Sequence, residues 1–298
     1  MEQLISFLEK EDVEFEREKK LSLCASVGIG GTAKILITPG NKEKFTKTLR
    51  FLINNKIPYF ITGNMTNLLP RDFEIDKVIL STLGLKSFAF YENTVEAEAG
   101  VLFSKVILSA KEKELGGVER LFGIPGTVGG MVRVNAGAYD LCVSDILLKV
   151  EIYDPSEDKV FILTKGDIAF SYRDSDIKKR ELIVLRAWFK LLKSKIGDID
   201  SAITDIRKKR VVSQPISQKT LGSVFKRSSI APASYLIDKC GLKGASVGGI
   251  SVSEKHAGFF VNDGSGTAEE FLKLCEIVKS KVNEKYGVVL EEEFECLQ

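Results

Sequence analysis

The most informative stretch of this sequence is GIPGTVGG, residues 123–130, followed by NAGAY, residues 135–139. Four glycines and a proline in eight residues cannot form the interior of an ordinary helix or strand. Glycine permits a positive φ and lets a ligand lie against the main chain, and Pro125 stiffens one point of the loop. Peptide N–H groups exposed in this way suit a phosphate or the edge of a flat ring. A tight structural turn is the alternative at this stage, because glycine punctuates many turns.

The composition of the chain is that of ordinary folded domains. It has 298 residues, of which 44% are apolar and 28% charged, and a formal net charge of +2. Nucleic acid is therefore not expected as a partner, because a dedicated polyanion binder is usually strongly basic. No apolar run approaches the roughly 20 residues that span a bilayer, and residues 1–20 lack a signal-peptide core. We expect a cytoplasmic protein without membrane insertion.

Cysteine and histidine usage argues against several kinds of site. The five cysteines form no C-x-x-C pair and the only histidine is His256, so no metal site is expected. A Ser-His-Asp triad would depend on His256, and neither a nucleophile elbow nor a Walker loop is present. Gly28, Gly30 and Ala33 match the dinucleotide fingerprint loosely, but a strand-like stretch follows where the fingerprint needs a helix. We therefore expect no Rossmann site.

Hydrophobic periodicity predicts an α+β protein with mixed sheets. The first twenty residues resemble one charged amphipathic helix, and Asn41 is the expected cap of the next. Further helices are expected at 41–56, 103–114, 199–212, 235–240 and 267–286. Strands are expected at 33–38, 57–62, 77–81, 87–91, 94–99, 147–154, 160–163, 183–191, 245–251, 258–261 and 288–294.

Three other motifs accompany the glycine loop: YRDS at residues 172–175, GSVFK at 222–226 and LEEE at 290–293. Together the four motifs make the chain resemble UDP-N-acetylenolpyruvoylglucosamine reductase, a flavoenzyme family, from about Leu21 to Glu293. No single motif is decisive, but four in register are hard to obtain by chance. The resemblance implies an α+β architecture. A two-part FAD-binding fold of the vanillyl-alcohol-oxidase type would precede a C-terminal α+β substrate domain.

The resemblance also implies a division of the chain into parts. Residues 1–75 would form the first FAD-binding subdomain, 76–195 the second, and 196–298 the substrate-binding domain with a catalytic tail. The chain is short, as in the type II form of the family. The residues that would bind FAD are Gly30, Gly31, Gly63, Asn64, Met65, Thr66, Asn67, Leu68, Gly123, Pro125, Gly126, Thr127, Gly129, Gly130, Asn135, Gly137 and Ala138.

The chain departs from the family pattern at a few positions. Met65 stands where the family pattern Gly-x-Gly-Ser-Asn has its second glycine, and Gly28 where lysine is frequent. Ala25 replaces a threonine and Ser228 a proline. These departures motivate one alternative function, a degenerate homologue that binds FAD or a UDP-sugar without turnover. Another alternative is a flavin oxidoreductase of the same fold with a different substrate.

The resemblance implies three catalytic residues: Arg173, Ser223 and Glu293. In the reduction of an enol ether, a guanidinium can stabilise the carboxylate enolate, and a serine hydroxyl can supply the proton that the carbanion needs. The residues alone leave other roles open. Arg173 could pair with Asp174 or Asp176, Ser223 could be a turn residue, and Glu293 could belong to a solvated strand edge.

The expected activity follows from the resemblance. The family reduces the enolpyruvyl group of UDP-N-acetylglucosamine enolpyruvate to UDP-N-acetylmuramate for peptidoglycan, with FAD bound non-covalently and NADPH as co-substrate. Cell wall biogenesis, cell shape, cell cycle and cell division are the associated processes. We expect a UDP-sugar substrate and a monomer. The substrate would contact Tyr172, Lys226, Arg227 and His256.

Overall fold

The computed structural model describes residues 1–298, and the chain forms two compact units. The first unit contains residues 1–17, 35–64 and 77–208, and the second contains residues 18–34, 65–76 and 209–298. Compactness therefore groups segments that are far apart in sequence. The division into 1–75, 76–195 and 196–298 stays a prediction. None of the helices is both long and apolar enough to cross a bilayer.

A four-stranded sheet has the order β1-β2-β5-β3. Its strands are β1 (Phe15–Lys20), β2 (Thr32–Ile37), β3 (Tyr59–Thr62) and β5 (Val78–Ser81). β5 pairs in parallel with both β2 and β3. The crossover from β2 to β3 contains α2 (Lys42–Asn54), whose cap is Asn41 as expected: its side chain accepts a hydrogen bond from the N–H of Lys44. α2 packs on α1 (Glu2–Lys10) through the stacked rings of Phe7 and Phe51.

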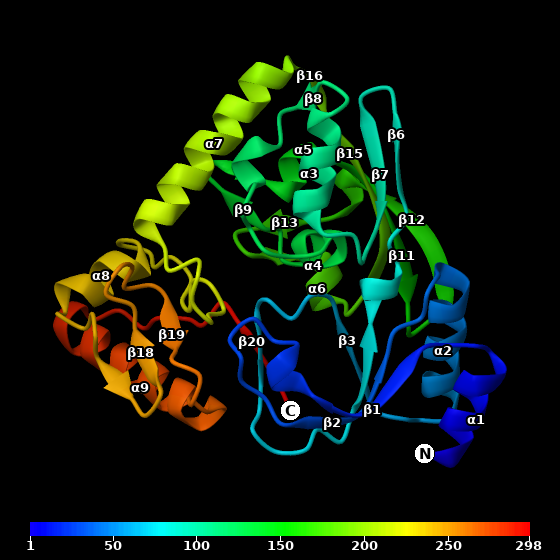
Figure 1. Ribbon diagram of the computed structural model, residues 1–298, viewed down its shortest axis with the longest axis horizontal. Helices are drawn as coiled ribbons and strands as arrows, with labels where there is room; N and C mark the ends of the chain where they lie inside the picture. The colour runs from blue at the N-terminus through cyan, green and yellow to red at the C-terminus, as the bar shows by residue number, and fades with distance from the viewer. The chain divides into compact units, whose positions relative to one another are not determined.

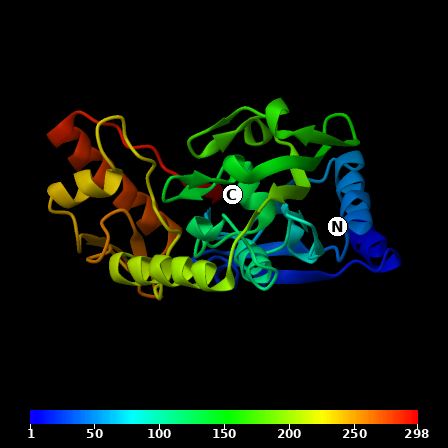
Figure 2. The same cartoon turned by 90° about the horizontal axis from the view of Figure 1, so that it is seen from above.

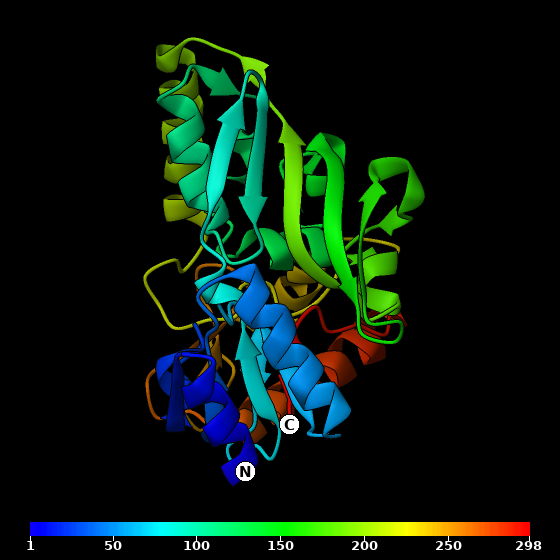
Figure 3. The ribbon, with the colours of Figure 1, turned by 90° about the vertical axis from the view of Figure 1, so that its right-hand side faces the viewer.

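A five-stranded antiparallel sheet in the order β12-β11-β15-β7-β6 forms the centre of the first unit (Figure 3). One face presents Val95, Val150 and Phe189 to the core, where α3 and α4 cover it. The strands are β6 (Phe88–Tyr91), β7 (Thr94–Glu98), β11 (Leu147–Asp154), β12 (Lys159–Thr164) and β15 (Ile183–Lys190), and the helices are α3 (Phe103–Lys111) and α4 (Val128–Arg133).

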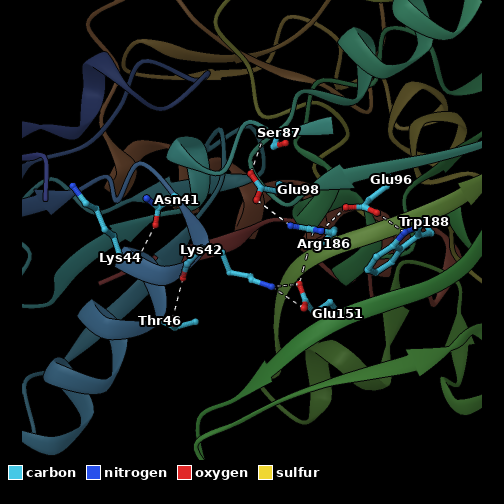
Figure 4. Close-up of polar contacts among 10 residues, drawn as sticks. All are labelled: Asn41, Lys42, Lys44, Thr46, Ser87, Glu96, Glu98, Glu151, Arg186 and Trp188. Atoms are coloured by element: carbon cyan, nitrogen blue, oxygen red, sulfur yellow. Dashed lines mark hydrogen bonds and ion pairs between the residues drawn. The ribbon is translucent and has the colours of Figure 1, made fainter. Parts of the chain in front are cut away.

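The other face of this sheet carries charge (Figure 4). Arg186 donates hydrogen bonds to Glu96 and, at 3.4 Å, to Glu98. Lys42, in the first turn of α2, donates to Glu151 of β11 at 2.9 Å. The ion pairs thus join the parallel sheet's helix to the antiparallel sheet within the first unit, and a half-buried cluster of this kind depends on all its partners.

Smaller elements complete the first unit. The short strands are β8 (Leu115–Gly116), β9 (Gly137–Ala138), β10 (Leu141–Cys142), β13 (Phe170–Ser171), β14 (Asp174–Ser175) and β16 (Leu192–Lys193). The short helices are α5 (Val143–Ile146) and α6 (Asp176–Lys179), and the 3₁₀ turns of the chain are η1 (Leu21–Leu23), η2 (Thr82–Gly84), η3 (Glu119–Leu121) and η4 (Lys165–Asp167). The long α7 (Ile196–Ser213) leads out of the first unit's last segment.

The second unit is built on a three-stranded antiparallel sheet with α9 packed against it and α8 against α9 (Figures 1 and 2). Phe271 of α9 contacts the rings of Phe260 and Phe294 at centroid distances of 5.3 and 5.4 Å, and Phe260 contacts Phe225 at 6.0 Å. The elements are α8 (Ala233–Lys239), β17 (Ser246–Val247), β18 (Ile250–Val252), β19 (Phe260–Asn262) and α9 (Ala268–Tyr286), together with β4 (Leu68–Pro70), which pairs in parallel with β20 (Glu295–Leu297).

Three expected elements differ in the structure. The first helix stops at Lys10 and the chain continues into β1, because the apolar spacing ends at Leu8 and Asp12 adopts a positive φ. The strand expected at 245–251 is the hairpin of β17 and β18. The strand expected at 288–294 is irregular, with a single bridge at Glu292, and the strand lies instead at 295–297.

Candidate active site

The loop at residues 123–130 leads into α4 in the first unit. Thr127 is the cap of α4, and its hydroxyl accepts a hydrogen bond from the N–H of Gly130 at 3.4 Å. A Cβ at Gly129 would lie 2.9 Å from the Cβ of Ala99, so glycine is required by close packing. The N–H of Gly129 donates to Ala99, and that of Val128 to Val101. The loop is thus fastened to the segment that follows β7.

The loop after β3 meets this glycine loop within the first unit. A Cβ at Gly63 would lie 2.5 Å from Oγ1 of Thr127, so the two loops can approach only because residue 63 is glycine. Thr62, the residue before it, is buried and its hydroxyl has no hydrogen-bond partner. Close packing of the two loops therefore explains the glycine at position 63.

Arg173 occupies the tip of a tight hairpin between β13 and β14. Its φ is +56°, at the second central position of the turn, where glycine is ordinarily favoured. Its guanidinium donates to the carbonyl of Gly137 at 2.8 Å and lies 5.0 Å from the ring of Tyr172. The side chain of Asn135 also reaches this hairpin, donating to the carbonyl of Ser171 at 3.0 Å. Tyr172, Arg173, Asn135 and Gly137 therefore come together, as expected.

The two acidic neighbours of Arg173 have partners of their own. Asp174 pairs with Lys179 at 3.1 Å. Burial acts to raise the pKa of Asp174, but the hydrogen bonds from Lys179 and from the N–H of Ser175, together with the charges of Lys179 and Lys178, bring it below its usual value. Asp176 accepts a hydrogen bond from the N–H of Ala169. A strained backbone at a residue whose neighbours are otherwise engaged is the pattern that functional sites show.

In the second unit, Ser223 and Glu293 lie on adjacent extended segments. Ser223 forms a bridge with Phe259, and the N–H of Val224 donates to Gly258 at 2.9 Å. On the other side, the N–H of Glu293 donates to Val224 at 2.8 Å. The hydroxyl of Ser223 donates to the carbonyl of Phe225 at 3.2 Å. The structure thus brings together two residues that are 70 positions apart in the sequence.

The glutamates around position 293 are distinguishable by their partners. Glu291 pairs with Lys226 at 3.3 Å, and Glu292 pairs with Lys279 at 2.8 Å. Both are surface ion pairs of a common kind. Lys226 was expected to contact substrate, and in this structure its ammonium is next to Glu291.

The loop containing Met65 belongs to the second unit and keeps a glycine-like backbone. Met65 has a φ of +46°, although it carries a Cβ and is 5% exposed. Ser26 holds the loop in place: its N–H donates to Met65, and its hydroxyl lies 2.7 Å from the carbonyl of Thr220. Ser26 was not among the expected site residues, because an isolated serine beside Ala25 offers no signal in the sequence.

Two other departures from the family pattern, Gly28 and Ser228, and the matching Gly31 have local surroundings that explain them. The stem of Lys219 occupies the space beside Gly28, where a Cβ would lie 2.7 Å from Cδ of the lysine. Ser228 closes a turn, because its hydroxyl donates to the carbonyl of Ala231 at 2.7 Å. Gly31 packs on the main chain of Phe73, whose oxygen would lie 2.1 Å from a Cβ.

His256 lies on the loop that precedes the segment paired with Ser223. Its Nδ1 accepts the N–H of Gly258 at 3.1 Å, which places the ring proton on Nε2. Burial lowers the pKa of His256, and Lys243 adds to the effect, so the ring is neutral near pH 7. A neutral imidazole with a defined Nε2–H is a hydrogen-bond donor rather than a cation.

Two family models match two parts of the chain. Residues 33–161 match the family described as "FAD binding domain", so the chain is in the class of FAD-binding proteins. Residues 214–297 match the family described as "UDP-N-acetylenolpyruvoylglucosamine reductase, C-terminal domain". The α+β, FAD-binding fold expected from the sequence is confirmed, and FAD is the cofactor.

Relatives extend the match over nearly the whole chain. The UDP-N-acetylenolpyruvoylglucosamine reductase of Clostridium botulinum (strain Okra / Type B1) is 40% identical over 268 residues, 90% of this chain and 87% of that protein. The protein of the same name from Caldicellulosiruptor saccharolyticus is 39% identical over 293 residues, 97% of this chain and 94% of that protein. The crystal structure of the enzyme from Thermus caldophilus has a TM-score of 0.81 and 29% identity, and the match covers 96% of this chain and 99% of that one. The chain belongs to the UDP-N-acetylenolpyruvoylglucosamine reductase family.

Proposed function

We infer that this chain reduces the enolpyruvyl group of UDP-N-acetylglucosamine enolpyruvate to UDP-N-acetylmuramate, with FAD as cofactor and NADPH as reductant. The observation that carries the inference is 40% identity over 90% of the chain to an enzyme named for this reaction. The main-chain bond from Glu293 to Val224 supports it, because it keeps a possible proton donor, Ser223, and a carboxylate on neighbouring segments of the chain. The product is a precursor of peptidoglycan, which ties the protein to cell wall biogenesis, cell shape and division.

The residues proposed to hold FAD come from both units. Gly63, Asn64 and the glycine loop belong to the first unit, with Asn135, Gly137 and Ala138 beside them. Gly30, Gly31 and residues 65–68 belong to the second. Close approach of the cofactor's phosphates to the main chain is what their glycines would permit. The cofactor would be held non-covalently.

The chemistry proposed for the chain's own residues concerns charge and a proton. FAD, when bound and reduced by NADPH, would supply hydride to C3 of the vinyl group. The guanidinium of Arg173 stabilises the negative charge that develops on the adjacent carboxylate, and Glu293 supports the same centre. The hydroxyl of Ser223 gives its proton to C2, which completes the saturated lactyl ether. The preset hairpin of Arg173 means that no reorganisation is needed to present its charge.

Substrate recognition is proposed for Tyr172, Lys226, Arg227 and His256. The cations would face the diphosphate, and the Nε2–H of His256 would donate to a phosphate or sugar oxygen. For Lys226 this requires exchange of its partner Glu291, an exposed carboxylate that can give way at small cost. We propose a cytoplasmic monomer without a nucleic-acid partner, consistent with the formal net charge of +2.

The experiment that tests the function is a flavin absorption spectrum followed through both half-reactions. The purified protein is expected to be yellow, to lose its flavin absorbance with NADPH in the absence of oxygen, and to recover it when the enolpyruvyl substrate is added. A colourless protein that cannot be reconstituted with FAD would contradict the proposal. Reduction by NADPH without reoxidation by the substrate would favour the degenerate homologue or an enzyme with another substrate.

A further inference from the structure

We propose that Asn67 is the positioning residue for Glu293, and that it couples the loop proposed to hold FAD to the carboxylate proposed to act on the substrate. The proposal rests on the proposed function. Sequence alone groups Asn67 with the cofactor-binding residues. In the structure its side chain is directed to the tail, where the amide Nδ2 donates to the main-chain carbonyl of Glu293 at 3.0 Å.

Asn67 engages the tail through its main chain as well. The N–H of Glu295 donates to the carbonyl of Asn67 at 3.0 Å. From there β20 runs parallel to β4, with Glu295 opposite Leu68 and Leu297 opposite Pro70. The loop and the tail are therefore one continuous piece of sheet, and displacement of the loop displaces the tail.

The contact fixes the second of the two main-chain polar groups of Glu293. Its N–H is bound to Val224, beside Ser223, and its C=O is bound to the Asn67 side chain. With both groups held, only rotation about the side-chain bonds is left to the glutamate. The bond from Asn67 is the one of the two that a substitution can remove, because the other joins main chain to main chain.

The arrangement separates two tasks within one loop. The loop is proposed to hold the cofactor, whereas the Asn67 side chain is bonded to the tail and is used for alignment. Loss of the side chain should therefore leave FAD in place and misplace Glu293. Such a defect would appear in the reaction with substrate and not in the reaction with NADPH.

The first experiment compares Asn67→Ala and Asn67→Asp with the wild-type holoenzyme in stopped-flow half-reactions. Both variants lose the donor, so we expect both to slow reoxidation by the enolpyruvyl substrate by roughly 3- to 10-fold, the loss that one hydrogen bond produces. Reduction by NADPH and the FAD dissociation constant should change by less than about twofold. Equal slowing of both half-reactions, or release of FAD, would overturn the proposal in favour of a structural or direct cofactor role.

Asn55→Ala is the matched control. Its Nδ2 also donates to a main-chain carbonyl, that of Phe51 at 2.8 Å, but at the exposed end of α2. Both half-reactions should match wild type. A similar slowing in this control would mean that loss of such a bond acts through general loosening, which contradicts the proposal.

The decisive measurement is the double variant Asn67→Ala/Glu293→Gln. If Asn67 acts through Glu293, the double variant should reoxidise no more slowly than Glu293→Gln alone. Multiplying effects would show that Asn67 acts independently, and would overturn the proposal while leaving the proposed function intact. If Glu293→Gln alone has no effect, Glu293 has no role for Asn67 to support and the proposal is overturned. If the wild type does not turn over the substrate, it is the proposed function that fails.

Discussion

The two parts of the proposed active site are built in different ways. Arg173 sits at the tip of a two-residue turn with a φ of +56°, and its guanidinium donates to the carbonyl of Gly137 and lies against the ring of Tyr172. Ser223 and Glu293 sit on extended segments joined by main-chain hydrogen bonds, and neither has a positive φ. Arg173 is thus positioned by a strained turn. Ser223 and Glu293 are positioned by the main-chain hydrogen bonds between their extended segments, called the ladder below.

This difference indicates where each part should be sensitive to change. A strained turn stores free energy, of order 1–2 kcal/mol for a non-glycine residue in the left-handed region, so its side chain is kept against a cost to stability. A ladder stores none, and its side chains can be exchanged without disturbing the main chain. A glycine substitution in the strained turn should lower activity while it relieves the backbone. A side-chain substitution on the extended segments should change activity without relieving any strain.

The largest effect is expected at the ladder, from Ser223→Ala. Removal of the proton donor should slow reoxidation by the substrate by roughly 10²–10⁴. Reduction by NADPH should be unchanged, because hydride transfer to the cofactor needs no proton from Ser223. Anaerobic stopped-flow absorbance measures both steps. Unchanged rates in both would make Ser223 a turn residue only.

Arg173→Gly tests the strained turn. Loss of the guanidinium should slow reoxidation by about 10²–10³, the range for removal of one preorganised donor at a developing charge. Stability should change by less than about 1 kcal/mol, because relief of the backbone offsets the lost bond to Gly137. Urea unfolding of the apoprotein measures the second quantity. A loss well above that value would mean that the turn is not strained.

Glu181→Gly is the matched control for that variant. Glu181 also has a positive φ, of +53°, and is exposed after α6. Here glycine should leave both half-reactions at wild-type rates, and stability should stay the same or rise by up to about 1 kcal/mol. Reduced activity would show that the strain, and not the guanidinium, is what matters at residue 173.

Glu293→Gln should slow reoxidation by about 10², since an amide keeps the shape but cannot support proton transfer. The protein should remain folded, yellow and reducible by NADPH. Glu291→Gln, Glu292→Gln and Glu295→Gln are the controls and should stay near wild type, with stability changes within about 0.5 kcal/mol. Equal activity in all four variants would return Glu293 to a solvated edge, and a loss at Glu291 or Glu295 would mean that the motif is in another register.

The smallest effect is expected from Met65→Gly, at a residue with a positive φ in the same unit as Ser223 and Glu293. Relief of the left-handed backbone, about 1 kcal/mol, opposes loss of a buried side chain, about 1.5–3 kcal/mol. The free energy of unfolding should therefore fall by about 1 kcal/mol in urea. The FAD dissociation constant, measured by fluorescence titration, should not rise. A tenfold rise would mean that the methionine side chain itself contacts the cofactor.

Local chemistry accounts for what the sequence predicts well. β11 has the expected bounds, Asn41 caps α2 as predicted, and the helix expected at 267–286 is α9. Gly63 and Gly129 lie where a Cβ would collide with another residue, and the spacing of the glycines had already indicated such close approach. Turn and cap signals act over short distances, so they can be read directly.

Pairing between strands that are far apart in the sequence accounts for what could not be predicted from the sequence. The stretch 288–294 contains two valines and a phenylalanine, yet its strand-like partners are single contacts with residues 224–226. β20 forms one step later because β4, more than 200 residues earlier, offers a parallel edge there. Met65 is a second example. It stands where the family pattern has glycine, yet its neighbours hold its backbone at a positive φ, a conformation typical of glycine.

The pairing of β20 with β4 also bears on the order in which the molecule can be made. The second unit needs residues 18–34 and 65–76 together with residues 209–298. During synthesis its first segments leave the ribosome long before their partners, whereas every segment of the first unit is available once residue 208 has emerged. The carboxylate at position 293 is placed only when residues 295–297 reach β4. A nascent chain stalled before that point would contain a folded first unit but no assembled Ser223–Glu293 pair. The protein would therefore become able to catalyse the reaction only after its last residues have paired with β4.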